Sequence, residues 1–135
     1  MALDTELLKS VTLFAGLDEK EAKKVASLFK ERNFSDGEAM AEEGKHGIGF
    51  FVIESGEAKV TVHGEDRATL GPGSYFGEIA LIDDGPRTAT VTATSDVKTH
   101  VLIAWDFRPL VKDDPDLAWG LLQGVAQMLR TREGY

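Results

Sequence analysis

The sequence predicts an α+β domain, mainly β, in which an antiparallel β-roll or jelly roll is flanked by N-terminal and C-terminal helices. Apolar residues recur at helical spacing over residues 4–32 and again over 106–132. Between them, residues 34–104 form short extended runs separated by glycine turns, a pattern typical of a sheet closed on itself. With 135 residues, 42% of them hydrophobic, we expect residues 1–135 to form a single domain around one core.

The N-terminal helical region breaks near Gly16 and restarts at Asp18. Asp18 and Glu21 have the spacing of a capping box, in which each side chain accepts a hydrogen bond from the other residue's backbone. Four apolar residues then recur at helical spacing: Ala22, Val25, Ala26 and Phe29.

The first strands of the roll are predicted around a glycine turn. Residues 48–53 read Ile-Gly-Phe-Phe-Val-Ile, a continuous apolar run that indicates a buried strand. Ser55 and Gly56 turn the chain, and residues 57–62 alternate back, so we expect them to pair with 48–53 as a hairpin.

A second pair of strands is predicted near the end of the roll. Residues 88–94 alternate strictly and place Ala89, Val91 and Ala93 on one face. Residues 97–104 follow after a short turn, and we expect them to be the antiparallel neighbour of 88–94.

Two capping signals begin the C-terminal helices. Asp106 is expected to cap a short helix, and Asp114-Pro115 supplies a cap and a first-turn proline for a longer one. Together the two helices are expected to span residues 106–132. The longer helix carries an expected apolar stripe made of Leu117, Leu121, Leu122, Val125, Met128 and Leu129.

Composition excludes several classes of function. The formal charge of −8, from 23 acidic and 15 basic residues, opposes binding to nucleic acid and to anionic membranes, because both depend on basic side chains. There is no cysteine, hence no disulfide framework and no thiolate nucleophile. No apolar run approaches the roughly 20 residues that span a bilayer, and no segment resembles a signal peptide, so we expect a cytoplasmic protein without a membrane partner.

The stretch from Gly71 to Val91 carries the most specific chemistry. It places the carboxylate of Glu78 directly after Gly77, then a short apolar turn, then Arg87 directly after Pro86. Arginine offers a planar, permanently charged fork to an anion, while a carboxylate accepts hydrogen bonds from hydroxyl groups. A small ligand that carries both hydroxyls and an anion needs this combination.

Phe76-Gly77-Glu78-Ile79-Ala80-Leu81, followed by Pro86-Arg87-Thr88-Ala89-Thr90-Val91, resembles the phosphate-binding cassette of cyclic nucleotide-binding domains. The resemblance extends to Leu13-Phe14-x-Gly16-Leu17, Phe34-x-x-Gly37-Glu38, Glu43-Gly44 and Phe51-x-Ile53-x-x-Gly56, and thus to nearly the whole chain. It implies that cyclic AMP or cyclic GMP, with no cofactor and no metal, binds against the following residues: Phe76, Gly77, Glu78, Ile79, Ala80, Arg87, Thr88 and Ala89. A threonine at the position of Thr88 is compatible with binding of either nucleotide, and we expect cyclic AMP to be the ligand.

The resemblance implies a regulatory sensor that is not an enzyme and that signals through its C-terminal helices to an effector protein or a fused output domain. We expect the long helix after Pro115 to act as a lid over the base, with a permanently docked helix or a homodimer seam as alternatives. A degenerate roll that serves only protein–protein contacts is the alternative function. Gly120-x-x-x-Gly124, which permits close helix packing, gives it some support.

Enzymatic and DNA-binding alternatives lack their residues. A cupin-type metal site needs a His-x-His pair, and His46, His63 and His100 are not so spaced. There is no Gly-x-Ser-x-Gly nucleophile elbow. A transcription factor of the catabolite activator type would continue after the long helix into a helix-turn-helix, which this sequence does not contain, so we expect no nucleic-acid partner.

Overall fold

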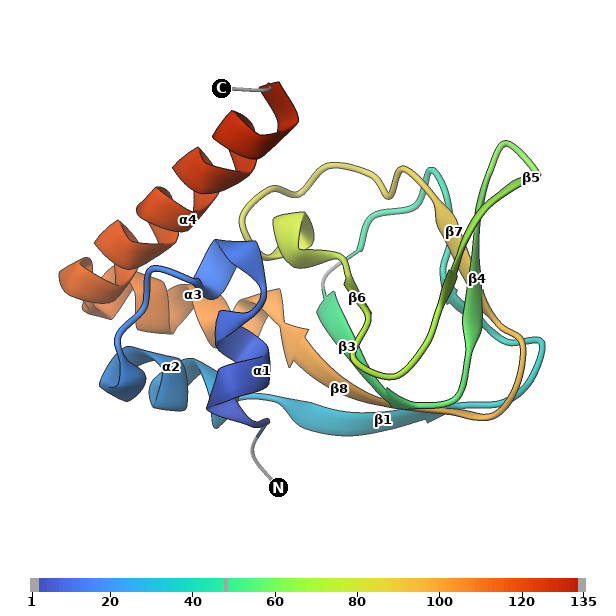
Figure 1. Cartoon of the computed structure of the whole chain (residues 1–135), viewed down its shortest axis with the longest axis horizontal. Helices are drawn as coiled ribbons and strands as arrows, with labels where there is room; N and C mark the ends of the chain where they lie inside the picture. Colours follow the sequence, from blue (N-terminus) through green and yellow to red (C-terminus); the bar gives the residue numbers. More distant parts are fainter. Residues whose placement is uncertain (1–2, 48, 134–135) are drawn as a thin grey trace. The chain divides into compact units, whose positions relative to one another are not determined.

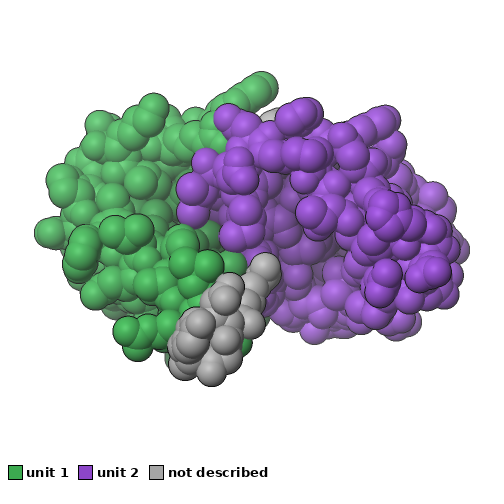
Figure 2. Space-filling view, turned by 90° about the horizontal axis from the view of Figure 1, so that it is seen from above, with its two compact units in different colours: residues 1–29, 105–135 green, residues 30–104 purple. Residues whose placement is uncertain are grey.

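The structure is a computed structural model, and it describes residues 3–47 and 49–133. The chain divides into two compact units, residues 30–104 and the combined segments 1–29 and 105–135 (Figure 2). The first unit holds the β-roll, and the second holds the helices that precede and follow it in the chain, as the sequence predicts.

The roll consists of two four-stranded antiparallel sheets (Figure 1). One sheet has the order β1-β8-β3-β6 and the other the order β2-β7-β4-β5. The strands are β1 (Lys30–Phe34), β2 (Ala39–Ala41), β3 (Gly49–Ser55), β4 (Ala58–Val62), β5 (Glu65–Leu70), β6 (Tyr75–Phe76), β7 (Thr90–Ala93) and β8 (Val97–Ile103), with one 3₁₀ turn, η2 (Glu78–Leu81).

Apolar side chains from both sheets fill the space between them. Phe34 and Phe51 lie with ring centroids 5.9 Å apart, and Phe76 stacks on Phe51 at 4.9 Å. Their buried neighbours in this core are Met40, Ile53, Ala58, Val91, Ala93, Val97 and Val101. Because aromatic pairs add to the free energy gained by burial, this cluster is the main attraction between the sheets.

Both predicted hairpins are wrong. β3 pairs with β6 and β8, whereas β4 pairs with β5 and β7, so the turn at Gly56 carries the chain from one sheet to the other. In the same way β8 pairs with β1 and β3 and not with β7. The two crossing connections contact each other: Thr94 N donates to Glu57 O at 2.9 Å, and Glu57 N donates to Ser95 Oγ at 3.0 Å. Strand alternation identified a buried face but not the pairing partner.

The only consecutive strands that form a long hairpin in the described chain are β4 and β5. Their two-residue turn is His63-Gly64, with φ of 52° and 80°. Positive φ at both central residues is typical of a type I′ turn, which matches the twist of the strands.

Three boundaries differ from the sequence predictions. Residues 30–32, predicted as the end of the helical region, begin β1, because they pair with β8 in register from Lys30 opposite Val101 to Phe34 opposite Val97. Asp106 lies in the first turn of α3 (Ala104–Asp113) and is not its cap. The predicted strand start at Ile48 lies outside the described residues.

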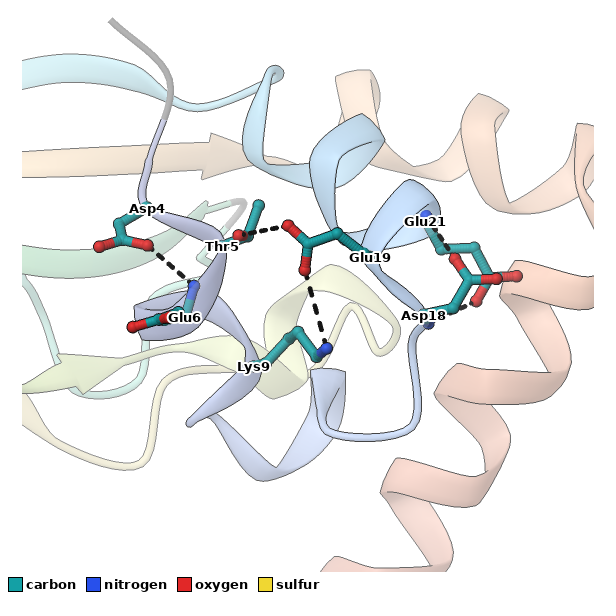
Figure 3. A network of polar contacts seen from close by, with 7 residues as sticks. All are labelled: Asp4, Thr5, Glu6, Lys9, Asp18, Glu19 and Glu21. Carbon is teal, nitrogen blue, oxygen red and sulfur yellow. Dashed lines mark hydrogen bonds and ion pairs between the residues drawn. The ribbon is translucent and has the colours of Figure 1, made fainter.

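The helical unit contains α1 (Thr5–Lys9), the 3₁₀ turn η1 (Thr12–Phe14), α2 (Glu19–Ala26), α3 and α4 (Pro115–Glu133). The predicted capping box of α2 is present, with Asp18 Oδ1 accepting from Glu21 N at 2.8 Å and Glu21 Oε1 accepting from Asp18 N at 2.9 Å (Figure 3). Glu19 joins α2 to α1, since it accepts from Thr5 Oγ1 at 2.9 Å and lies 3.8 Å from Lys9 Nζ.

Glycines allow α4 to lie directly on the segment around η1. A Cβ at Gly124 would overlap the carbonyl of Leu13, and one at Gly120 would come within 3.1 Å of Gly16 O. From the other side, a Cβ at Gly16 would be 2.7 Å from Gly120 O. The Gly120-x-x-x-Gly124 pattern therefore serves close packing within the unit.

The predicted apolar stripe of α4 is correct only in part. Leu117 and Leu121 are buried and Val125 and Met128 are half-buried, but Leu122 and Leu129 are 57% and 56% exposed. The two glycines occupy the buried side in their place, because the helix lies too close to its neighbour there to admit a side chain.

Candidate functional site

The cassette begins with a glycine in a conformation that other residues rarely adopt. Gly77 has φ of +89°, which lets the chain leave β6 and enter η2 at once. Ala80 and Leu81 are buried and fasten the turn to the roll, while Ile79 and Ile82 are exposed. The hydrogen bonds of the turn begin with Ala80 N donating to Gly77 O at 3.0 Å. The amides that precede it have no acceptor within the turn, as at the start of any helix, and such amides can donate to an anion.

The backbone of Arg87 is fixed by the segment between β2 and β3. Arg87 N donates to Lys45 O at 2.8 Å, and Gly44 N donates to Arg87 O at 2.9 Å. Next to this pair, Glu43 N donates to Thr90 Oγ1 at 3.0 Å, and Pro86 forms a β-bridge with His46. The position of Arg87 therefore depends on a segment some forty residues earlier as well as on Pro86.

The guanidinium of Arg87 lies in a slot between two glycines. A Cβ at Gly47 would overlap Nε, Cζ and Nη2 of Arg87, and a Cβ at Gly77 would overlap Nη1. The slot is closed by the carbonyl of Gly49, which accepts from Arg87 Nη2 at 2.7 Å. Any side chain at either glycine would displace the guanidinium.

Burial and charge act against each other at this arginine. Burial lowers the pKa of Arg87, and the nearby negative charge of Glu78 raises it. The pKa of Tyr75 is raised, first by burial and then by the charge of Glu78. A half-buried guanidinium has lost much of its hydration, and a second anion beside it would restore favourable electrostatics.

The structure places the predicted site residues in three groups. The first group is Gly77, Glu78 and Arg87. Gly77 lies against the Arg87 guanidinium, and Glu78 is close enough for its charge to raise the pKa of Arg87. Thr88 is exposed and Ala89 half-buried, directly after Arg87. The remaining three have different surroundings: the ring of Phe76 stacks on Phe51 in the core, Ala80 is buried, and Ile79 is 42% exposed.

Sequence reasoning missed Gly47 and Gly49. The two glycines are separated by one residue, and Gly49 is the first residue of β3. Only the fold brings them to Arg87, about forty residues later in the chain. The signal that could have found them is the spacing itself, since two glycines before an apolar strand allow close approach of another group.

Two features are absent from the described residues. Among residues 3–47 and 49–133, no group of three or more His, Asp or Glu side chains could hold a metal ion. No helix in that part of the chain is both long and apolar enough to cross a membrane.

Comparison with known proteins places this chain in a family. Residues 31–114 match the family model of the cyclic nucleotide-binding domain. A cAMP-dependent protein kinase regulatory subunit of Yarrowia lipolytica is 43% identical over 97 residues, which cover 70% of this chain and 26% of the relative. The N-terminal domain of a transcriptional regulator from Streptomyces coelicolor superposes with a TM-score of 0.83 and 32% identity, covering 95% of this chain and 93% of that one.

A ligand-bound structure is also similar. The regulatory domain of Toxoplasma gondii PKA, solved with cAMP, has a TM-score of 0.69 and 34% identity over 81% of this chain and 43% of that one. The chain therefore belongs to the cyclic nucleotide-binding domain family, a family of regulatory and not catalytic domains. It spans about a quarter of the length of the kinase regulatory subunit that it matches.

Proposed function

We propose that this domain is a sensor that binds a 3′,5′-cyclic nucleotide in the cassette and is not an enzyme. The observation that carries the proposal is the guanidinium of Arg87, half-buried in a glycine slot beside Glu78 and the first amides of η2. A cyclic nucleotide presents one anionic phosphodiester next to a free 2′-hydroxyl. In the proposed complex Arg87 donates to the phosphate oxygens, and Glu78 accepts from the hydroxyl.

We favour cyclic AMP over cyclic GMP as the ligand. The regulatory domain from Toxoplasma gondii, 34% identical, was solved with cAMP, and the Yarrowia relative is a cAMP-dependent kinase subunit. Thr88, directly after Arg87, is exposed and has a hydroxyl that suits either phosphate or guanine.

The output that we propose runs through α3 and α4 to an effector protein or a fused output domain. Four large apolar side chains of these helices are exposed and available for such a contact: Trp105, Trp119, Leu122 and Leu129. A lid function for α4 and a homodimer seam use the same surface. With a net charge of −8, we expect no binding of the domain itself to duplex DNA.

Titration calorimetry with both nucleotides tests binding. We expect wild-type protein to bind cyclic AMP more tightly than cyclic GMP, and Arg87→Ala to weaken binding by about 10- to 100-fold, the loss of a charge-assisted contact of ~1.5–3 kcal/mol. Arg67→Ala is the matched control, because Arg67 is exposed on β5 and forms an ion pair with Glu65 at 3.6 Å. If wild-type protein binds neither nucleotide at millimolar concentration, the degenerate roll that serves protein contacts becomes the better reading.

A 2′-deoxy nucleotide tests the role of Glu78. We expect the deoxy analogue to bind wild-type protein about tenfold more weakly than the parent, because the carboxylate loses its hydroxyl partner. Glu78→Gln should reduce this difference and should cost less than Arg87→Ala, since the amide oxygen still accepts a hydrogen bond. Equal binding of both nucleotides by wild-type protein would assign Glu78 another role.

A further inference from the structure

A cavity lies at the edge of the roll formed by β1 and β2, opposite the edge formed by β5 and β6. Its volume is about 440 Å³, within the range of about 300–1,000 Å³ typical of small-molecule sites. It opens between the edge strands β1 and β2, and its lining includes none of the cassette residues except Arg87. The deepest lining side chains are apolar and belong to the core, namely Met40, Phe51 and Val101.

Two cations lie at the edge of the sheet, on an inner face whose other β1 and β8 side chains are apolar apart from Thr99. Lys30 lies opposite Val101 and Arg32 opposite Thr99 in the β1–β8 pairing. Residues directly opposite in an antiparallel pair share a face, so Lys30 and Arg32 are on the same face as the buried Phe34. Arg32 extends over the ring of Phe34, with Cζ 4.8 Å from its centroid. The cations thus border the apolar floor of the cavity.

The charge around this cavity is opposite to that of the protein. Its lining has four Lys or Arg side chains and two Glu, whereas the chain carries −8. Glu31 lies 3.4 Å from Lys98, which also lies 3.1 Å from Glu54, and Glu42 lies 2.8 Å from Lys45, one of the four cations. Because cationic side chains outnumber carboxylates in this lining, the cavity favours an anionic group.

Arg87 separates this cavity from the cassette. Its Nη1 atom lies against Gly77 of the cassette, while Nε, Cζ and Nη2 lie against Gly47, which lines the cavity. Gly49, whose carbonyl accepts from Nη2, also lines the cavity. One guanidinium therefore forms a wall of both spaces, and an anion on one side changes the electrostatics that an anion meets on the other.

We propose that the cavity between β1 and β2 is a second ligand site, specific for an amphipathic carboxylate. The carboxylate lies at the opening beside Arg32, and the hydrocarbon part lies on Met40, Phe51 and Val101. Because Arg87 also lines the cavity, a carboxylate bound there reduces the attraction of Arg87 for the phosphodiester, so occupancy weakens nucleotide binding in the cassette. Only this coupling rests on the proposed function; the site itself does not.

Octanoate, used below its micellar concentration, is the probe, and backbone amide chemical shifts report the binding site. We expect shifts in β1, β2 and residues 45–49 in the absence of nucleotide. Acetate, which has the charge without the chain, and 1-octanol, which has the chain without the charge, should each bind at least about tenfold more weakly, since each lacks one of the two contributions. Shifts confined to residues 76–81, or acetate that binds as well as octanoate, would overturn the proposal.

Charge reversal at the opening gives the decisive comparison. Arg32→Glu should weaken octanoate binding by at least about tenfold, whereas Arg67→Glu, also an exposed arginine on a strand of the roll, should change it less than about twofold. Arg32→Gln should give an intermediate loss, and equal unfolding midpoints of the variants would exclude a folding defect. If Arg32→Glu binds octanoate as wild-type does, Lys30 and Arg32 only protect an edge strand from pairing and the site does not exist.

A nucleotide titration separates coupling from competition. As octanoate increases, the apparent Kd for cyclic AMP should rise to a plateau, and cyclic AMP should raise the Kd for octanoate by the same factor. A rise without a plateau would mean that octanoate occupies the cassette, and an unchanged Kd would refute the shared role of Arg87. Should wild-type protein not bind cyclic AMP, the proposed function fails, while octanoate binding and its dependence on Arg32 still test the cavity.

Discussion

The roll and the helical unit both depend on glycines at close contacts, but the contacts differ in kind. In the roll, Gly47 and Gly77 leave room for the guanidinium of Arg87, a side chain. In the helical unit, Gly120 and Gly124 leave room for the backbone of Gly16 and Leu13. A side chain can move aside at modest cost and a packed backbone cannot. The same substitution should therefore impair ligand binding in one unit and stability in the other.

The largest effect is expected at Gly124. Gly124→Ala places a methyl group on the Leu13 carbonyl and should lower the free energy of unfolding by about 2–3 kcal/mol, the usual cost of overpacking, although alanine is the better helix former. Urea denaturation measures it. Gly120→Ala, whose nearest contacts are 3.0–3.1 Å, should cost less. Equal stability of Gly124→Ala and wild-type protein would show that α4 does not pack tightly on η1.

The next effect is expected at Gly47, where no positive φ complicates the substitution. Gly47→Ala displaces the guanidinium and should weaken cyclic AMP binding by about tenfold or more, ~1.4 kcal/mol. Its free energy of unfolding should change by less than about 1 kcal/mol, because the overlap is with a movable side chain. Calorimetry and urea denaturation measure the two quantities.

Gly71→Ala is the control for Gly47→Ala. A Cβ at Gly71 meets nothing within 4 Å, so both affinity and stability should stay within about 0.5 kcal/mol of wild type. If Gly47→Ala resembles this control in affinity, the glycine slot does not position Arg87 for the ligand.

The smallest effect is expected at Asp114, which holds the start of α4 by other means than glycine packing. Its Oδ1 accepts from Leu117 N at 3.2 Å and its Oδ2 from Lys24 Nζ at 3.1 Å, and these two bonds lower its pKa below 3.8. Because the folded-state pKa is lowered, the stabilisation is complete above pH 3.8 and is lost as the pH falls through the folded-state value.

Urea denaturation of wild type and Asp114→Asn across this acid range tests the assignment. The difference in free energy of unfolding between the two proteins should be largest near neutral pH and should narrow as the pH falls. A difference that is the same at every pH would mean that the carboxylate charge contributes nothing to the start of α4.

Local chemistry determined much of this protein from the sequence alone. The capping box at Asp18, the cap and first-turn proline at Asp114-Pro115 and the turn at Gly77 each depend on neighbouring residues, and each is present. The order Gly77, Glu78, Arg87 was sufficient to indicate an anion-binding cassette, because residues joined by a short loop remain close together in the fold. The same order also identified the family that the comparisons found.

Only the tertiary structure decided the pairing of strands and the surroundings of Arg87. The apolar run of residues 48–53 and the alternation of residues 57–62 indicate only that each strand buries side chains. Either sheet can supply the partner, so these patterns could not reveal that the two strands belong to different sheets. Gly47, Gly49 and the segment that holds the Arg87 backbone lie some forty residues from that arginine. Their approach is set by packing between the sheets, a long-range contribution that no local pattern contains.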